Sequence, residues 1–209
     1  MKVNVLKPSL SKLKTDLINL NERDFIEKYI FTEGNWYFEE YLNLGAEVAA
    51  SKEIELKSTI KECLNVTETD IYIVGSGKIG YSLSPKKLFC PFRVEASSGG
   101  KASDIDIAII SEEIYNNYWA LFRKSYTPLY SYSYGFISRE IYRGYINDRN
   151  IEEIPNCRKE WRKSISSLNK KLSMKFNVKH SVNYRIYRNQ NDFFEYVEQS
   201  LSEIKRGAI

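Results

Sequence analysis

The sequence "IYIVGSGKIGYS" at residues 71–82 decides how this chain is interpreted, because a short apolar run ends there in a glycine-rich turn. Gly75, Gly77 and Gly80 fit the G-x-G-x-x-G pattern of dinucleotide-binding loops, and the same stretch comes one residue short of a Walker A loop. The pair Gly75-Ser76 instead fits a strand that ends in a simple Gly-Ser turn. These three interpretations predict different proteins.

The residues after the glycines argue against the first two patterns. A dinucleotide-binding loop opens directly into a helix whose N-terminus carries the pyrophosphate. Here "YSLSPKK" follows at residues 81–87, and Pro85 with two serines makes a helix unfavourable. A Walker A loop needs a lysine after its second glycine, whereas this chain has Tyr81. The sequence therefore favours the Gly-Ser turn.

A second motif, "SDIDIAII" at residues 103–110, supports this choice. Asp104 and Asp106 are two residues apart, so in a strand they project from one face, while the alternating isoleucines face the core. Two neighbouring carboxylates repel each other unless a cation lies between them. A hard divalent ion such as Mg²⁺ is the natural partner, and metal ions of this kind assist phosphoryl transfer. An Asp-x-Asp pair alone is also typical of a solvent-facing strand edge.

Together the two motifs resemble the nucleotidyltransferase superfamily with the DNA polymerase β-like fold, over roughly residues 70–125. The family signature is an apolar strand, a Gly-Ser turn with a further glycine nearby, and a strand carrying Asp-x-Asp after a serine. The matching residues are Gly75, Ser76, Gly80, Ser103, Asp104 and Asp106. The resemblance implies that Gly75 and Ser76 hold the triphosphate of an NTP. It also implies that Asp104 and Asp106 bind Mg²⁺ or Mn²⁺ and are catalytic.

The chemistry of the turn agrees with this role. Glycine lets backbone amides approach a phosphate closely, and the short hydroxyl of Ser76 adds a donor. The resemblance implies that Ser103 also contacts the nucleotide, because it stands where the family signature has its serine. Lys78, inside the turn, is expected to add positive charge near the phosphates. The alternative, with equal weight, is that Lys78 is an ordinary exposed loop lysine.

The chain departs from the family pattern in two ways. Residues 83–102, with two prolines and a Gly-Gly pair, form an extra irregular insertion. The expected later strand, "HSVNYRIYRN" at 180–189, lacks the third carboxylate that many active members carry. Acidic residues elsewhere downstream are candidates to replace it: Glu140, Asp148, Glu152, Glu153 and Asp192. If none reaches the site, chemistry would be slow or absent while nucleotide binding persists.

The rest of the pattern predicts an α+β fold: a small mixed β-sheet with flanking helices, nucleotidyltransferase-like, after an N-terminal helical section. That section covers residues 1–69 and the main domain residues 70–209. Apolar spacing and capping residues predict helices at 9–20, 21–30, 45–66, 111–126, 157–172 and 189–207, the last ending at Gly207. Alternation predicts strands at 130–136 and 180–188. An apolar stripe with Ile54 is expected to face the core, as are Trp36, Trp119 and Trp161.

Composition limits the compartment and the partners. The three cysteines are scattered, which favours a reducing compartment over a disulfide scaffold or a zinc site. Neither a signal peptide nor a membrane span is evident, so a cytoplasmic protein is expected. The net charge is +4, yet residues 155–190 hold ten Lys or Arg against the single acid Glu160. This basic segment suggests an anionic partner such as RNA or a nucleotide, or else a solvated helix face.

The leading hypothesis is a Mg²⁺-dependent nucleotidyltransferase that moves an NMP from an NTP to an acceptor hydroxyl. A catalytically inert module that binds nucleotide or nucleic acid, as a regulator or antitoxin, is the alternative. A plain nucleic-acid-binding protein that relies on residues 155–190 is a third possibility. The acceptor, the preferred NTP and the oligomeric state do not follow from the sequence.

Overall fold

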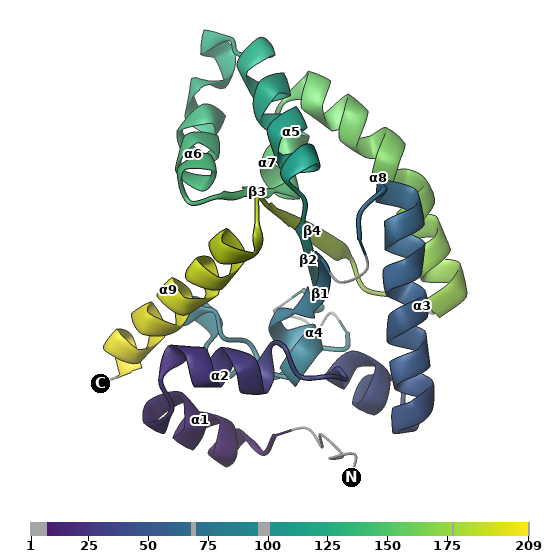
Figure 1. Ribbon diagram of the computed structural model, residues 1–209, viewed down its shortest axis with the longest axis vertical. Helices are drawn as coiled ribbons and strands as arrows, with labels where there is room; N and C mark the ends of the chain where they lie inside the picture. Colours follow the sequence, from purple (N-terminus) through teal and green to yellow (C-terminus); the bar gives the residue numbers. More distant parts are fainter. Residues whose placement is uncertain (1–7, 68–69, 96–100, 177, 209) are drawn as a thin grey trace. The chain divides into compact units, whose positions relative to one another are not determined.

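The computed structural model describes residues 8–67, 70–95, 101–176 and 178–208. Four strands form one sheet in the order β1-β2-β4-β3 (Figure 1). They are β1 (Ile71–Val74), β2 (Ile105–Ile110), β3 (Tyr145–Asn147) and β4 (Val182–Tyr187). Helices flank this small mixed sheet, so the predicted α+β class is confirmed.

The chain divides into two compact units. The first unit contains Met1–Glu55, Ile73–Asp106 and Glu195–Ile209, and the second contains Leu56–Tyr72 and Ile107–Phe194. Their boundaries pass through α3 (Ala46–Leu64), β1, β2 and α9 (Gln190–Ala208). These boundaries differ from the segments 1–69 and 70–209 expected from the sequence, and that division stays a prediction. All the sequence-predicted site residues lie in the first unit.

The N-terminal helices of the first unit begin where their capping residues predict. The Ser9 hydroxyl accepts a hydrogen bond from the Lys12 amide at 3.2 Å and starts α1 (Leu10–Asn19). The Asn21 side chain accepts from the Asp24 amide at 2.8 Å and starts α2 (Glu22–Tyr29). Leucines of α1 and aromatic and aliphatic residues of α2 are buried at helical spacing: Leu13, Leu17, Phe25, Ile26 and Tyr29.

After α2, a π-helix (η1, Tyr37–Tyr41) brings aromatic side chains onto the irregular insertion. The Phe92 ring lies 5.1 Å from the Trp36 ring and 5.9 Å from the Tyr37 ring. The prediction for α3 is correct in its extent but wrong in one side chain, because Ile54 is 62% exposed. Its neighbour Glu53 is the buried residue, and its carboxylate accepts a hydrogen bond from the Asn35 side chain at 2.8 Å.

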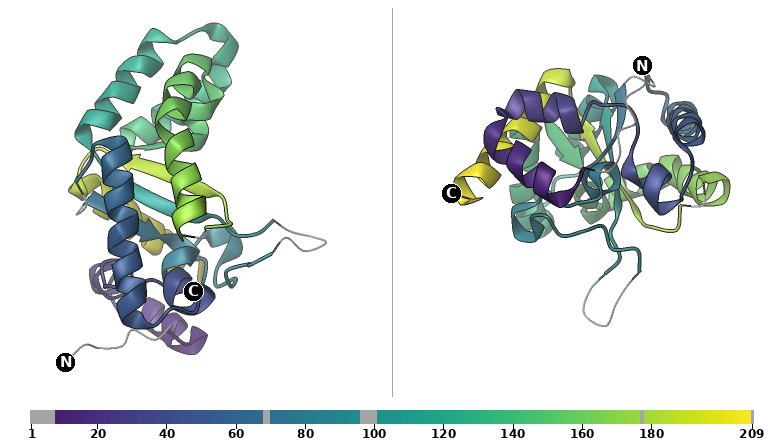
Figure 2. Two further views of the ribbon diagram at one scale, coloured as in Figure 1. Left: turned by 90° about the vertical axis from the view of Figure 1, so that its right-hand side faces the viewer. Right: turned by 90° about the horizontal axis from the view of Figure 1, so that it is seen from below.

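The second unit contains an α-helical hairpin that follows β2. Figures 1 and 2 show the chain leaving β2 along α5 (Glu112–Lys124) and returning along α6 (Ser131–Tyr142), with the short helix η4 (Pro128–Tyr130) between them. Ser111 caps α5, since its hydroxyl accepts from the Ile114 amide at 3.2 Å. The Tyr134 hydroxyl donates to the Phe122 carbonyl at 2.6 Å and ties α6 to α5.

Two expectations for this hairpin are wrong. Residues 130–136 are helical rather than a strand, because Tyr134 and Ile137 pack inward at helical spacing and override the alternation of tyrosine and serine. Trp119 is 39% exposed rather than buried, because Tyr118 and Phe122 form the buried face of α5 and Trp119 lies beside that face.

The remaining elements complete the second unit. These are α7 (Asp148–Glu153) and the long basic helix α8 (Pro155–Phe176), which confirms the predicted helix at 157–172. Strands β3 and β4 pair antiparallel, with Ile146 opposite Ile186. Trp161 of α8 is buried, with its ring 5.7 Å from the rings of Tyr118 and Tyr184. None of the helices in the described chain is long and apolar enough to cross a bilayer.

Candidate functional site

Gly75 and Asp106 lie against each other in the first unit. At the end of β1 the chain turns at Gly75, which has a φ of +64°, in the left-handed region that glycine adopts without strain. A Cβ atom at this position would lie only 2.8 Å from Oδ2 of Asp106. The Asp106 carboxylate therefore contacts the turn itself, and a side chain at residue 75 would displace it.

The two aspartates flank the buried Ile105 at the start of the second strand, and their common face stays a prediction. Asp106 is the second residue of β2, and Asp104 directly precedes the strand. Both are half-buried, whereas Ile105 and Ile107 are 2% and 1% exposed. The alternation is confined to the start of the strand, because Ala108 and Ile110, on the face of Asp106, are buried too. Both aspartates keep part of their surface open to solvent.

Ser76 follows Gly75 in α4 (Gly75–Ile79), a helical segment of five residues. The side chain of Ser76 is half-buried, and its hydroxyl makes no hydrogen bond to a described residue. Its carbonyl accepts from the Gly80 amide at 2.9 Å, which closes the turn. Gly80 has a φ of +82°, and a Cβ there would meet the Trp36 ring at 2.9 Å. Gly80 is therefore required by the turn and by packing.

Ser103 closes the base of the insertion. Its amide donates to the Arg93 carbonyl, and its hydroxyl accepts from the Arg93 amide, both at 2.9 Å. The described part of the insertion is irregular, as predicted, apart from a short helix (η3, Pro85–Lys87). Residues 96–100 of the predicted insertion lie outside the described chain. The nucleotide contact predicted for Ser103 stays a prediction, and its visible role is to fix the start of the Asp-x-Asp segment.

Lys78 is 8% exposed, so it is not the exposed loop lysine that was the alternative. Its ammonium donates to the carbonyls of Thr32 at 2.5 Å and Gly34 at 2.6 Å, in the loop between α2 and η1. Burial raises the pKa of the nearby Glu39 carboxyl, and the charge of Lys78 opposes that rise. The predicted phosphate contact of Lys78 stays a prediction, while these bonds give its ammonium a structural function.

The acidic residues considered as third carboxylates all belong to the second unit, where most have structural partners. Glu140 accepts from the Asn147 amide at 3.0 Å, and burial raises the pKa of its carboxyl. Asp148 accepts from the Tyr184 amide of β4 at 2.9 Å. The Asp192 carboxylate receives two bonds from the Arg188 guanidinium, at 2.7 and 3.0 Å.

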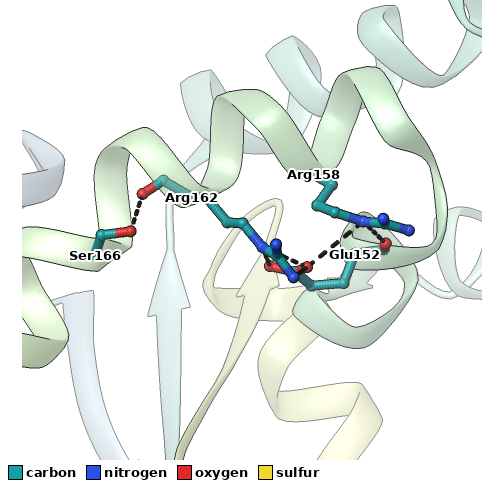
Figure 3. A network of polar contacts seen from close by, with 4 residues as sticks. All are labelled: Glu152, Arg158, Arg162 and Ser166. Carbon is teal, nitrogen blue, oxygen red and sulfur yellow. Dashed lines mark hydrogen bonds and ion pairs between the residues drawn. The ribbon is translucent and has the colours of Figure 1, made fainter.

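Glu152 is held by the basic helix, and Glu153 is exposed. Figure 3 shows Arg158 and Arg162 reaching Glu152, with ion-pair distances of 3.7 and 2.8 Å between nitrogen and oxygen. Within the described residues, no group of three or more His, Cys, Asp or Glu side chains is placed to hold a metal ion. A third protein ligand beside Asp104 and Asp106 is therefore not found there.

The same contacts reduce the free charge of α8. This helix carries seven Lys or Arg and one acid. Arg158 and Arg162 pair with Glu152, and Lys163 pairs with Glu160 at 2.8 Å. Part of the positive charge expected to attract an anion is thus neutralised within the second unit.

Comparison of the chain with protein-family models, curated proteins and solved structures finds no significant match.

Proposed function

We propose that the chain is a Mg²⁺-dependent nucleotidyltransferase, which moves a nucleoside monophosphate from an NTP to an acceptor hydroxyl. The acceptor hydroxyl gives up its proton to water, and its oxygen bonds to the α-phosphorus while the bond from that phosphorus to the bridging oxygen breaks, so that pyrophosphate leaves. The observation that supports this is the contact of Asp106 with Gly75, with Oδ2 2.8 Å from the position of a Cβ. A triphosphate seated on the turn would lie beside a carboxylate pair suited to its metal.

The residues fit a magnesium ion that the nucleotide helps to bind. Mg²⁺ is usually held by one or two carboxylates together with substrate phosphates and water, so Asp104 and Asp106 suffice as protein ligands. Bound there, the ion would neutralise charge on the phosphate oxygens. Gly75 lets the backbone approach a phosphate, and the Ser76 hydroxyl is available to donate to it. Catalysis would come mainly from positioning and charge neutralisation.

The test is transfer of label from each α-labelled NTP to total RNA and to nucleotides, with Mg²⁺ or Mn²⁺. Asp104→Asn/Asp106→Asn keeps the shape of the carboxylates and removes their charge. Glu112→Gln/Glu113→Gln is the matched control, because it removes two exposed carboxylates elsewhere. We expect the wild type to transfer label and the first variant to transfer it at least about a hundredfold more slowly. The control variant should transfer label at the wild-type rate. Equal activity of both variants would refute the proposal.

The alternative is an inert module that binds the nucleotide without transferring it. It is favoured by the absence of a three-ligand group among the described residues. Metal-dependent NTP binding that is lost in Asp104→Asn/Asp106→Asn, without any label transfer, would support it. Isothermal titration calorimetry with and without Mg²⁺ measures the NTP affinity of the wild type and of this variant.

A further inference from the structure

One side of α6 presents a continuous row of exposed rings and guanidinium groups. Tyr132, Phe136 and Arg139 are spaced by four and three residues, so they lie on one face of the helix. Arg143, four residues further on, directly follows the helix. Tyr132 is 79% exposed, Phe136 is 40% exposed, and both arginines are exposed. We call these four residues the α6 ridge. At 1.5 Å per residue, the ridge extends about 16 Å along the helix.

Contacts between neighbours order the ridge. The rings of Tyr132 and Phe136 lie 5.0 Å apart in an edge-to-face arrangement. The Arg139 guanidinium lies 4.7 Å from the centroid of the Phe136 ring, and its Nε donates to the Gly135 carbonyl at 3.0 Å. Arg143 continues the row, 5.9 Å from the ring of Tyr145 in β3. The side chains are thus partly fixed before any ligand binds, which lowers the entropy lost on binding.

The ridge lies in a stretch of sequence that has no acidic residue between its two ends. No Asp or Glu occurs between Glu113 and Glu140, a segment that contains Arg123, Lys124 and Arg139. Glu140 itself is half-buried and accepts from the Asn147 amide. Exposed rings beside positively charged arginines favour an anionic partner that has flat faces of its own.

We propose that the α6 ridge binds single-stranded RNA, with bases stacked on Tyr132 and Phe136 and phosphates on Arg139 and Arg143. Unpaired bases stack on aromatic rings and on guanidinium planes, and every base offers such a face. The Tyr132 hydroxyl, which has no bond to a described residue, offers a partner for a 2′-hydroxyl. A protein partner would bury the rings as well, but arginines in line with exposed rings fit a phosphate backbone better.

The ridge differs from the basic helix α8 in the chemistry that it offers. On α8, the cations Arg158, Arg162 and Lys163 are engaged by acids of the same unit. On the ridge, the Arg139 side chain contacts a ring and a main-chain carbonyl, which leave its charge uncompensated. RNA binding by the ridge does not depend on nucleotidyl transfer, because it needs neither the metal nor the Gly75 turn.

The test is fluorescence anisotropy with a labelled 12-nucleotide single-stranded RNA of mixed sequence, in EDTA and without NTP. Tyr132→Ala/Phe136→Ala should weaken binding by at least about thirtyfold. Arg139→Gln/Arg143→Gln should weaken it and reduce the slope of log K against log salt by about 1.4. Tyr142→Ala is the matched control, because Tyr142 is a 92% exposed tyrosine of the same helix that lies off the ridge. It should bind as the wild type does.

Further variants and ligands separate strand binding on the ridge from attraction by charge, from binding on α8 and from dimerisation. Asp104→Asn/Asp106→Asn should bind the strand normally, which keeps this inference distinct from the proposed reaction. Duplex RNA that competes as well as the single strand would overturn the inference, since it would show attraction by charge alone. Binding that is lost in Lys170→Gln/Lys171→Gln but not in the ridge variants would place the strand on α8 instead. The wild type could instead form a dimer and bind no RNA. If Tyr132→Ala/Phe136→Ala then made the protein monomeric, the ridge would be assigned to contact with a second copy of the chain.

Discussion

Oδ2 of Asp106 lies 2.8 Å from the point where a Cβ on Gly75 would stand, although the two residues are 31 positions apart in the sequence. The glycine is therefore needed twice, once for its left-handed backbone and once for the room it leaves to the carboxylate. This contact joins the two motifs on which the proposed function rests.

Gly75→Ala is expected to destabilise the fold by roughly 1–2 kcal/mol from the backbone conformation alone, and to displace Asp106. Gly77→Ala is the matched control two residues later. A Cβ at Gly77 would meet the nearest side-chain atoms at 3.5 and 3.7 Å, which is ordinary contact. Urea unfolding of the wild type and of the two variants measures the difference in their free energies of unfolding. Similar midpoints for both variants would contradict the geometry described for the turn.

Lys78→Met is expected to destabilise the protein by roughly 2–4 kcal/mol, because it leaves the carbonyls of Thr32 and Gly34 without their donor. Lys86→Met, at an exposed lysine of the same unit, is expected to change stability little. Nucleotide affinity, measured by titration at a temperature where both variants are folded, separates the two roles of Lys78. Unchanged affinity would assign it to the fold, and a loss confined to Lys78→Met would restore its predicted phosphate contact.

Asp16 links stability to pH. Hydrogen bonds from Lys28 and then from Tyr29 hold the pKa of its carboxyl below the ordinary value of 3.8. Its stabilising contribution is therefore complete above about pH 4 and is lost as the pH falls through the lowered value in the folded state. Asp16→Asn should lower the free energy of unfolding by about 1 kcal/mol at pH 7, and the difference should shrink below pH 4. Glu27→Gln, at an exposed position of α2, is the control in the same pH series.

Two glycines at α6 are expected to respond to alanine in opposite directions. Gly135 lies within the helix, and a Cβ there would meet nothing within 4 Å, so Gly135→Ala should stabilise by about 0.5–1 kcal/mol. Gly144, just past the helix, has a φ of +75°, and a Cβ would collide with Asp192. Gly144→Ala should therefore destabilise by more than about 2 kcal/mol. Thermal unfolding compares them, and the same sign for both would contradict this account.

Much of the local structure could be predicted because it depends on near neighbours in the chain. Ser9, Asn21 and Ser111 cap helices by hydrogen bonds to residues three positions later. In "SDIDIAII" the isoleucines are buried as predicted, and the two aspartates on either side of Ile105 are half-buried. Where the prediction failed, at 130–136 and at Trp119, local alternation and side-chain size competed with packing between α5 and α6. That packing depends on contacts that a sequence pattern does not contain.

The sequence by itself determined that the chain has a glycine turn after one strand and two aspartates at the start of another. The reason is that strand periodicity and the conformational freedom of glycine are properties of short segments. Only the tertiary structure decided that Asp106 meets Gly75 and that the ammonium of Lys78 serves main-chain carbonyls. It also decided that Tyr132 and Phe136 stay exposed, because a tyrosine or phenylalanine faces solvent or core according to the elements that pack around it.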